Sequence, residues 1–171
     1  MELPVGYRFK PTDEELVFHY LINKACNRAL PAQAVKEITA RDLYLKHPKC
    51  SDITAPSSSG ENKEWYFFIP EEENSFHRSG KETTRFVGDG TGFWKLIGEE
   101  RPMFNINGQV FALKRNLTYF SGNPSEPRRT HWKMELFRLP LEFYTSQNPK
   151  EKGEKWVLGR VKRGNEFKGC F

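Results

Sequence analysis

The stretch that decides the fold is Arg8-Phe9-Lys10-Pro11-Thr12-Asp13-Glu14-Glu15. It predicts an extended segment that ends at Pro11, followed by a helix with a capped amino end. Thr12 can cap the amino end of that helix, and Glu15, three residues later, can reach back to complete a capping box. Asp13 and Glu14 add negative charge to the first turn, where the helix dipole favours it. Apolar residues then recur at helical spacing, which extends the helix to about Lys24.

Beyond its first fifty residues the chain changes from helical patterns to strand patterns. A second helix over Thr39–His47 is expected to stop before Pro48, because a residue before proline avoids the helical region. Asn107-Gly108 supplies a turn. Strands are predicted over Glu64–Ile69, Gly92–Gly98, Gln109–Phe120, Thr130–Leu139 and Lys155–Lys162. Short strands joined by turns, without alternating helices, predict an α+β fold, mainly β, with a twisted antiparallel sheet flanked by a few helices.

Composition sets limits without naming a function. The 171 residues suit a single domain, 1–171, and neither a repeat nor a polar linker divides them. The net charge of +5 gives weak support for an acidic partner. Three widely spaced cysteines with no metal-ligand motif favour a reducing compartment. We expect no metal, no cofactor, no signal peptide and no membrane span.

A strand bracketed by glycines, Gly92-Phe93-Trp94-Lys95-Leu96-Ile97-Gly98, is the first candidate for chemistry. In an extended chain Phe93, Lys95 and Ile97 share one face, and Trp94 and Leu96 share the other. From spacing alone, an amphipathic strand with a solvated lysine is the simpler interpretation. The glycines at 88–92 do not indicate a phosphate-binding loop, because they lead into a strand and no Gly-Lys-Ser/Thr follows.

A series of motifs runs in order from Leu3 to Arg163. They are Leu3-Pro4-Val5-Gly6-Tyr7, Asp42-Leu43-Tyr44, Glu64-Trp65-Tyr66-Phe67-Phe68, Trp94-Lys95, Arg128-Arg129-Thr130-His131-Trp132-Lys133-Met134, Phe137-Arg138-Leu139 and Trp156-Val157-Leu158-Gly159-Arg160. With the opening stretch, they closely resemble the NAC family of plant-specific transcription factors, whose amino-terminal domain binds DNA. The motifs near Phe137 and Trp156 are mainly hydrophobic and are assigned to core packing.

The resemblance implies sequence-specific binding of double-stranded DNA by a dimer in the nucleus, with an edge strand around Lys95 in the major groove. The DNA-contacting region would be about 77–133. The implied DNA-binding residues are Arg85, Lys95, Ile97, Arg101, Lys114, Arg115, Arg128 and Arg129. Of these, Lys95 and Ile97 are the candidates for base contacts, and the arginines and lysines supply phosphate contacts. Because Lys114 and Arg115 are adjacent on a strand, only one of them is expected to face a given DNA backbone.

The resemblance also implies how the dimer forms. Family dimers use the amino-terminal segment, about residues 1–25 here, and a reciprocal Arg–Glu ion pair. The corresponding residues are Leu3, Pro4, Arg8 and Glu15. We expect a homodimer, with heterodimers to other NAC proteins as a further option. An enzyme is not expected, because the four histidines are scattered and no nucleophile–base spacing stands out.

Departures from the family pattern keep a second function open. Ile97 stands where the family usually has Thr, and Glu99-Glu100-Arg101 where it has Thr-Asp-Lys. The segment at 123–127 lacks the usual lysines. Acidic residues beside a DNA-contacting strand would repel phosphate and weaken the salt-dependent part of the affinity. The alternative is a NAC-fold interaction module that heterodimerises with relatives but binds DNA weakly.

Overall fold

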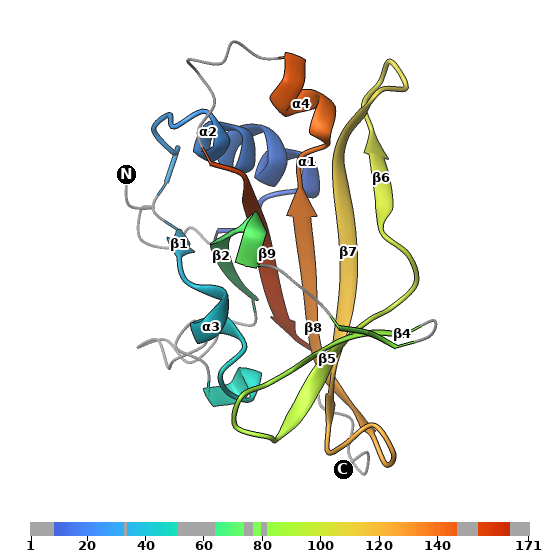
Figure 1. Ribbon diagram of the computed structural model, residues 1–171. Coiled ribbons are helices and arrows are strands. Elements are labelled where there is room, and N and C mark those ends of the chain that lie inside the picture. The colour runs from blue at the N-terminus through green and yellow to red at the C-terminus, as the bar shows by residue number, and fades with distance from the viewer. Residues whose placement is uncertain are drawn as a thin grey trace.

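The computed structural model describes residues 9–32, 34–50, 64–73, 77–79, 82–146 and 154–164. One large sheet runs through the molecule, with short helices on both of its faces (Figure 1). Its strands are β1 (Val35–Glu37), β2 (Glu64–Pro70), β3 (His77–Ser79), β4 (Glu82–Phe86), β5 (Gly92–Leu96), β6 (Arg101–Phe104), β7 (Val110–Ser121), β8 (Arg128–Arg138) and β9 (Trp156–Arg163).

The predicted capping box opens the amino-terminal helical segment. The Thr12 hydroxyl accepts a hydrogen bond from the Glu15 amide at 3.2 Å, and the Glu15 carboxylate accepts one from the Thr12 amide at 3.3 Å. This segment consists of α1 (Asp13–Glu15), a π-helical stretch η1 (Leu16–Leu21) and α2 (Ile22–Ala25). The prediction of a capped helix here is confirmed, and the π-helical middle is a feature that no sequence pattern indicated.

The second predicted helix is shorter than expected. Thr39 caps α3 (Ala40–Leu43), which ends at Leu43 rather than at His47. The cause is a tertiary contact, because the amides of Gly88 and Asp89 donate hydrogen bonds of 2.8 Å to the carbonyls of Tyr44 and Leu45. A short 3-10 turn, η2 (Pro48–Cys50), follows, and another, η4 (Glu71–Glu73), comes after β2.

The strand order is β1-β2-β9-β8-β7-β5-β4-β3, and β6 pairs with β7 off this path. All these pairs are antiparallel except β1 with β2, which is parallel. The sheet is therefore antiparallel as predicted, apart from this one pair. The five predicted strands are present with ends shifted by one or two residues. The sequence analysis missed β1, β3, β4, β6 and the helix α4 (Leu141–Ser146). The polar stretch Ala55-Pro56-Ser57-Ser58-Ser59-Gly60, whose composition predicts a loop, lies outside the described residues.

The expectation that the strand around Lys95 is an edge strand is wrong. β5 pairs with β7 along its whole length and with β4 through Phe93, Trp94 and Lys95. The hydrogen-bonding positions that an edge would expose are therefore occupied on both sides. No strand was predicted between Ile69 and Gly92, so the β4 partner of this strand was not expected from the sequence.

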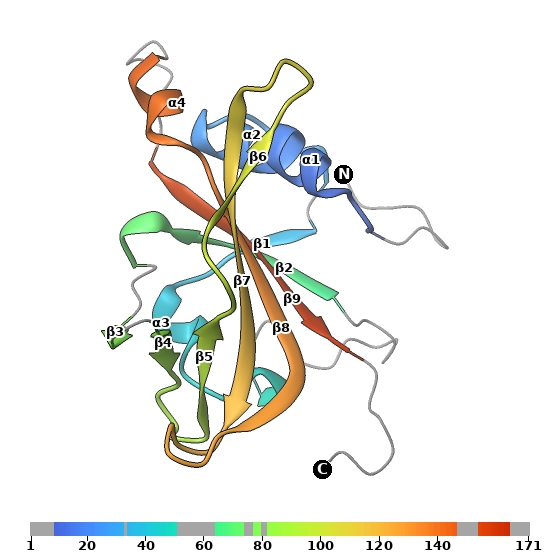
Figure 2. The same ribbon diagram turned by 90° about the vertical axis from the view of Figure 1, so that its right-hand side faces the viewer.

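The two faces of the sheet carry separate hydrophobic cores. On one face, here called the helix face, a hydrophobic core contains Leu16, Val17, Tyr20 and Leu21 of η1 together with Tyr144 of α4. On the other, here called the α3 face, Leu43 and Tyr44 pack on a core that includes Trp94 and Trp132. Figure 2 shows α1 and α2 on one side of the sheet at its upper end, and α3 on the opposite side lower down.

Candidate nucleic-acid interface

The helices cover only part of the helix face, and basic side chains occupy the rest. The strand register places Lys162 of β9 opposite Lys133 of β8, Lys133 opposite Thr118 of β7, and Thr118 opposite Lys95 of β5. Directly paired residues project to the same side of a sheet, so these four side chains form one row. Lys133 is exposed, so none of the helices in the described residues covers it.

Lys95 and Ile97 project from this open half, as the alternation of the strand predicted. The Lys95 ammonium lies 5.7 Å from the centre of the Phe120 ring, which itself stacks on Phe93. Ile97 is 39% exposed, and its amide donates a hydrogen bond of 2.8 Å to the carbonyl of Asn116. A cation and an exposed apolar group therefore lie two residues apart on one surface.

The predicted arginines at the start of β8 divide between the faces. Arg129 pairs with Phe120 and therefore lies on the helix face with Lys95, whereas Arg128 pairs with Ser121 and lies on the other face. Both side chains are exposed. Arg101 of β6 is also exposed and pairs with Lys114, which places it on the helix face.

Lys114 is held in an ionic cluster where α1 meets the sheet. Its ammonium lies 2.6 Å from a carboxylate oxygen of Asp13 and 2.6 Å from one of Glu135. Arg160 joins the same two acids at 2.6 Å and 2.8 Å, and Lys162 lies 2.9 Å from Glu135. These five residues are here called the Glu135 cluster, and Lys114 is not available to a phosphate while it holds.

The Glu135 cluster shifts the ionisation of its members. Burial alone would raise the pKa of Glu135, but hydrogen bonds from Arg160, Lys114 and Lys162 outweigh it and lower the pKa to about 2. Burial would also raise the pKa of Asp13, but the hydrogen bonds from Lys114 and Arg160 outweigh burial and lower it. Burial would lower the pKa of Lys114, but its bonds to Asp13 and Glu135 raise it. Glu135, Asp13 and Lys114 therefore stay charged at neutral pH.

Arg115 lies on the α3 face, opposite to Lys114, as expected for neighbours on a strand. Its Nε donates a hydrogen bond of 2.8 Å to Glu100, and Arg138 donates another of 2.8 Å to the same carboxylate. Burial would raise the pKa of Glu100, but the two arginines outweigh it and lower the pKa. The expectation that Glu100 acts as a free repelling charge is therefore wrong, because two arginines neutralise it.

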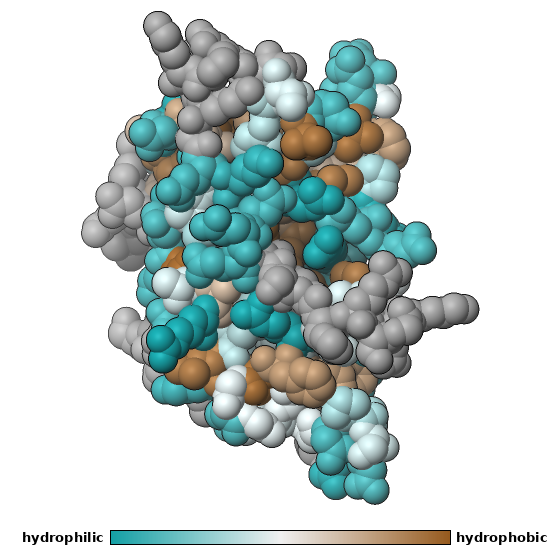
Figure 3. All heavy atoms as spheres, in the orientation of Figure 1, coloured by the Kyte–Doolittle hydropathy of each residue, from teal (hydrophilic) through white to brown (hydrophobic). Residues whose placement is uncertain are grey.

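Arg85 also lies on the α3 face, because it pairs with Trp94 of β5. Its guanidinium lies 4.4 Å from the centre of the Tyr44 ring, and its Nη1 donates a hydrogen bond of 3.4 Å to the carbonyl of Glu73. Figure 3 shows this face of the molecule, where hydrophilic residues predominate across the middle. The structure thus separates Arg85 and Arg115 from Lys95 and Ile97 by the thickness of the sheet.

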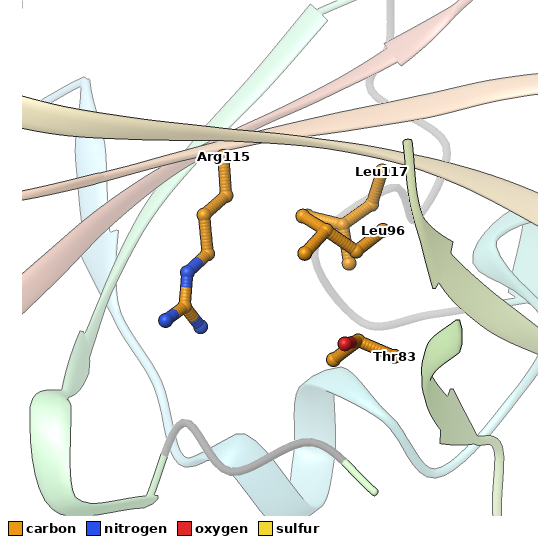
Figure 4. Close-up of a pocket in the computed structure, with 4 residues that line it drawn as sticks. All are labelled: Thr83, Leu96, Arg115 and Leu117. Carbon is orange, nitrogen blue, oxygen red and sulfur yellow. The ribbon is translucent and has the colours of Figure 1, made fainter. Parts of the chain in front are cut away.

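A small depression on the α3 face is lined by Thr83, Leu96, Arg115 and Leu117. Figure 4 shows Arg115 extending from β7 beside the two leucines, with Thr83 across from it. This depression has no room for a small molecule, whose sites typically enclose roughly 300–1,000 Å³. In the described part of the chain, no group of three or more metal-ligating side chains comes together.

The predicted dimerisation residues are only partly described. Leu3, Pro4 and Arg8 lie outside the described residues, and Glu15 is exposed at the start of the helical segment. None of the helices in the described ranges is long and apolar enough to cross a membrane.

The sequence analysis missed Lys133, although the signal was present. Trp132 and Met134 are apolar on either side of it, so alternation alone predicts that Lys133 projects to the opposite face. It also assigned Arg138 and Arg160 to core packing because their neighbours are hydrophobic. Their acidic partners lie far away in the sequence and no local pattern could have identified them.

Comparison with known proteins decides the family. A family model described as "No apical meristem (NAM) protein" matches residues 4–139, which is most of the chain. The chain belongs to the NAC-domain family. NAC-domain relatives from Arabidopsis thaliana include NAC transcription factor 25, 34% identical over 95% of this chain, and Transcription factor JUNGBRUNNEN 1, 36% identical over 91%. NAC domain-containing protein JA2 of Solanum lycopersicum is 33% identical over 96%.

This NAC domain covers 50%, 52% and 44% of those three relatives, so the chain spans about half the length of the curated relatives it matches. The first two of these relatives are named as transcription factors. The family-specific opening, the capping box and the mainly β architecture predicted from the sequence all agree with this assignment.

Proposed function

We propose that this NAC domain binds double-stranded DNA sequence-specifically as a dimeric transcription regulator. The observation that carries the proposal is the open half of the helix face, where Lys95 and Ile97, in and after β5, project on the same side as Arg129 of β8, with β7 between them. In this proposal Lys95 and Ile97 contact base edges, with Ile97 against an apolar group such as a thymine methyl. Arg129 and Arg101 contact phosphates. A nuclear location belongs to the same proposal, and a fluorescent fusion too large for passive entry would check it.

Lys95 should matter differently from Arg128 and Arg129. Lys95→Ala should weaken binding to the preferred duplex and relax base preference, because one good base contact contributes about 1–3 kcal/mol of discrimination. Arg129→Ala should instead weaken all duplexes similarly and lower the salt slope by about one unit for its lost phosphate contact, whereas Arg128→Ala, on the other face of the sheet, should change neither. Titrations of a selected duplex and a scrambled one at several salt concentrations measure both quantities. Selection from random duplexes that enriches no motif would contradict sequence-specific binding.

Dimerisation through the amino terminus is the second part of the proposal. Arg8→Glu or Glu15→Arg should weaken the dimer, because each replaces an opposite-charge pair by a like-charge pair. The double exchange should partly restore it if the pair is reciprocal. Analytical ultracentrifugation at micromolar concentration measures this, and a monomeric unmutated protein would rule the proposal out.

Glu15 needs a further control because its carboxylate also completes the capping box. Glu15→Gln keeps a side-chain acceptor that can serve the box, since Gln is found at that position as well as Glu. It removes only the charge. A dimer weakened by Glu15→Gln, in a protein whose thermal melting is unchanged, would assign the effect to the ion pair rather than to the helix start.

A specific observation favours the alternative of an interaction module. Three of the eight predicted DNA-binding residues are engaged within the molecule, since Lys114 and Arg115 pair with acids and Arg85 packs on Tyr44. A protein that dimerises but binds every duplex weakly, with Lys95→Ala having no effect, would support that function instead.

A further inference from the structure

The basic row on the open half of the helix face extends beyond the residues that the family pattern identifies. Its members lie at directly opposed positions on β5, β7, β8 and β9, in the order Lys95, Thr118, Lys133 and Lys162. Neighbouring strands are about 4.8 Å apart, so the row is about 14 Å long. Along the axis of the double helix, one DNA strand rises 3.4 Å per nucleotide. A row of this length that lies parallel to the axis therefore spans roughly four nucleotides.

The charge around this row is positive even after its acidic neighbours are included. In the Glu135 cluster the two acids, Asp13 and Glu135, face three cations, Lys114, Arg160 and Lys162. One net positive charge therefore remains there. Lys133 and Arg129 add to it, because both are exposed and neither is joined to an acid within the described residues. Lys162 keeps 36% of its side chain exposed while it contacts Glu135.

The adjacent turn cannot supply this charge. Residues 123–127, between β7 and β8, contain no lysine or arginine. The turn is organised by Asn123, whose side-chain oxygen accepts hydrogen bonds from the amides of Ser125 and Glu126 at 3.1 Å each. Its one charged residue is the acidic Glu126. The positive charge that would attract a polyanion therefore does not come from this turn.

We propose that Lys133 is the main phosphate contact of this row, with Lys162 next to it on β9 and Arg129 on the same face of β8, while Lys95 at the far end of the row contacts base edges. This proposal rests on the proposed DNA-binding function and deepens it, because it assigns the duplex backbone to the strand surface rather than to the 123–127 turn. The occupant is the sugar–phosphate backbone of double-stranded DNA, whose regular negative charge complements a line of cations.

The test is Lys133→Gln in the full chain, compared with Lys36→Gln. Lys36 is a matched control: it is also an exposed strand lysine, but it pairs with Phe67 and therefore projects from the α3 face of the same sheet. Each substitution removes one charge from an exposed position, so melting temperatures should stay close to that of the unmutated protein. Lys133→Gln should lower the salt slope of duplex binding by about 0.9 and weaken binding roughly tenfold at 50 mM salt. Preferred and scrambled duplexes should lose the same factor.

Each result of this experiment decides something. A loss with Lys133→Gln and none with Lys36→Gln supports the row. Equal losses for both variants would show that only net charge matters and would overturn it. Unchanged binding of Lys133→Gln, while Lys95→Ala weakens binding, would overturn the row but leave the proposed function intact. No binding of any duplex by the unmutated protein at 50 mM salt would overturn both.

Discussion

Replacing Glu135 by glutamine should lower the free energy of unfolding by about 3 kcal/mol. Glu135 is the acid that three cations share, and its side chain is only 10% exposed. Arg160, 7% exposed, would keep its charge and its bond to Asp13 but lose its second acid. A buried charge that loses a partner is strongly destabilising, because nothing compensates its lost hydration. Denaturant titration at pH 7 measures the change.

The pH dependence of stability should identify the same residue. The pKa of Glu135 is lowered to about 2 in the folded protein, below the ordinary value of 4.5. A lowered carboxylate pKa contributes stability that is present above the unfolded pKa and is lost as pH falls through the folded one. The unmutated protein should therefore lose about 3 kcal/mol from this group between roughly pH 5 and pH 2. Glu135→Gln should show a shallower decline over that window.

Glu99→Gln provides the matched control for both measurements. Glu99 is exposed and lies on the loop before β6. Its substitution should change stability by less than about 0.5 kcal/mol. If Glu135→Gln behaved like Glu99→Gln in denaturant and kept the full pH slope, the Glu135 cluster would not stabilise the fold.

The sequence predicted those parts of the fold that depend on local chemistry. Thr12 and Glu15 make their capping box because both partners lie within four residues of each other. The strands β2, β7, β8 and β9 were recognised from long apolar or alternating runs. β6 was missed because it contains Pro102, which weakens a strand prediction. The structure shows why a proline fits there: among the described strands β6 pairs with β7 alone, so its other side is an edge.

The candidate site was predicted less completely, because side-chain partners depend on the tertiary fold. Alternation correctly separated Lys95 and Ile97 from Trp94, and Lys114 from Arg115. It could not show that Asp13 binds Lys114 across 101 positions of sequence, or that Glu100 binds two arginines. The family resemblance supplied a set of basic residues, but only the sheet register shows which of them share a face.

Gly159 is the position where a small substitution should have the largest effect on packing. An added Cβ would lie 2.0 Å from Cζ of Phe67 and within 2.5 Å of two further ring atoms. Phe67 has no solvent exposure and belongs to the core of the α3 face, so its ring has no room to move away. Gly159→Ala should therefore destabilise the domain by about 3 kcal/mol through overpacking. Cysteine, which is larger than alanine, should be tolerated no better.

A second substitution tests whether the Phe67 ring is the cause. Phe67→Leu removes the ring atoms that the new Cβ would meet, at the expense of a cavity. Alone it should destabilise the protein, because large-to-small changes in a core lose contacts that the surroundings do not fully replace. Combined with Gly159→Ala it should cost clearly less than the sum of the two single changes, as expected for residues in direct contact. Additive costs in denaturant titrations would show that Gly159 is required by the backbone rather than by Phe67.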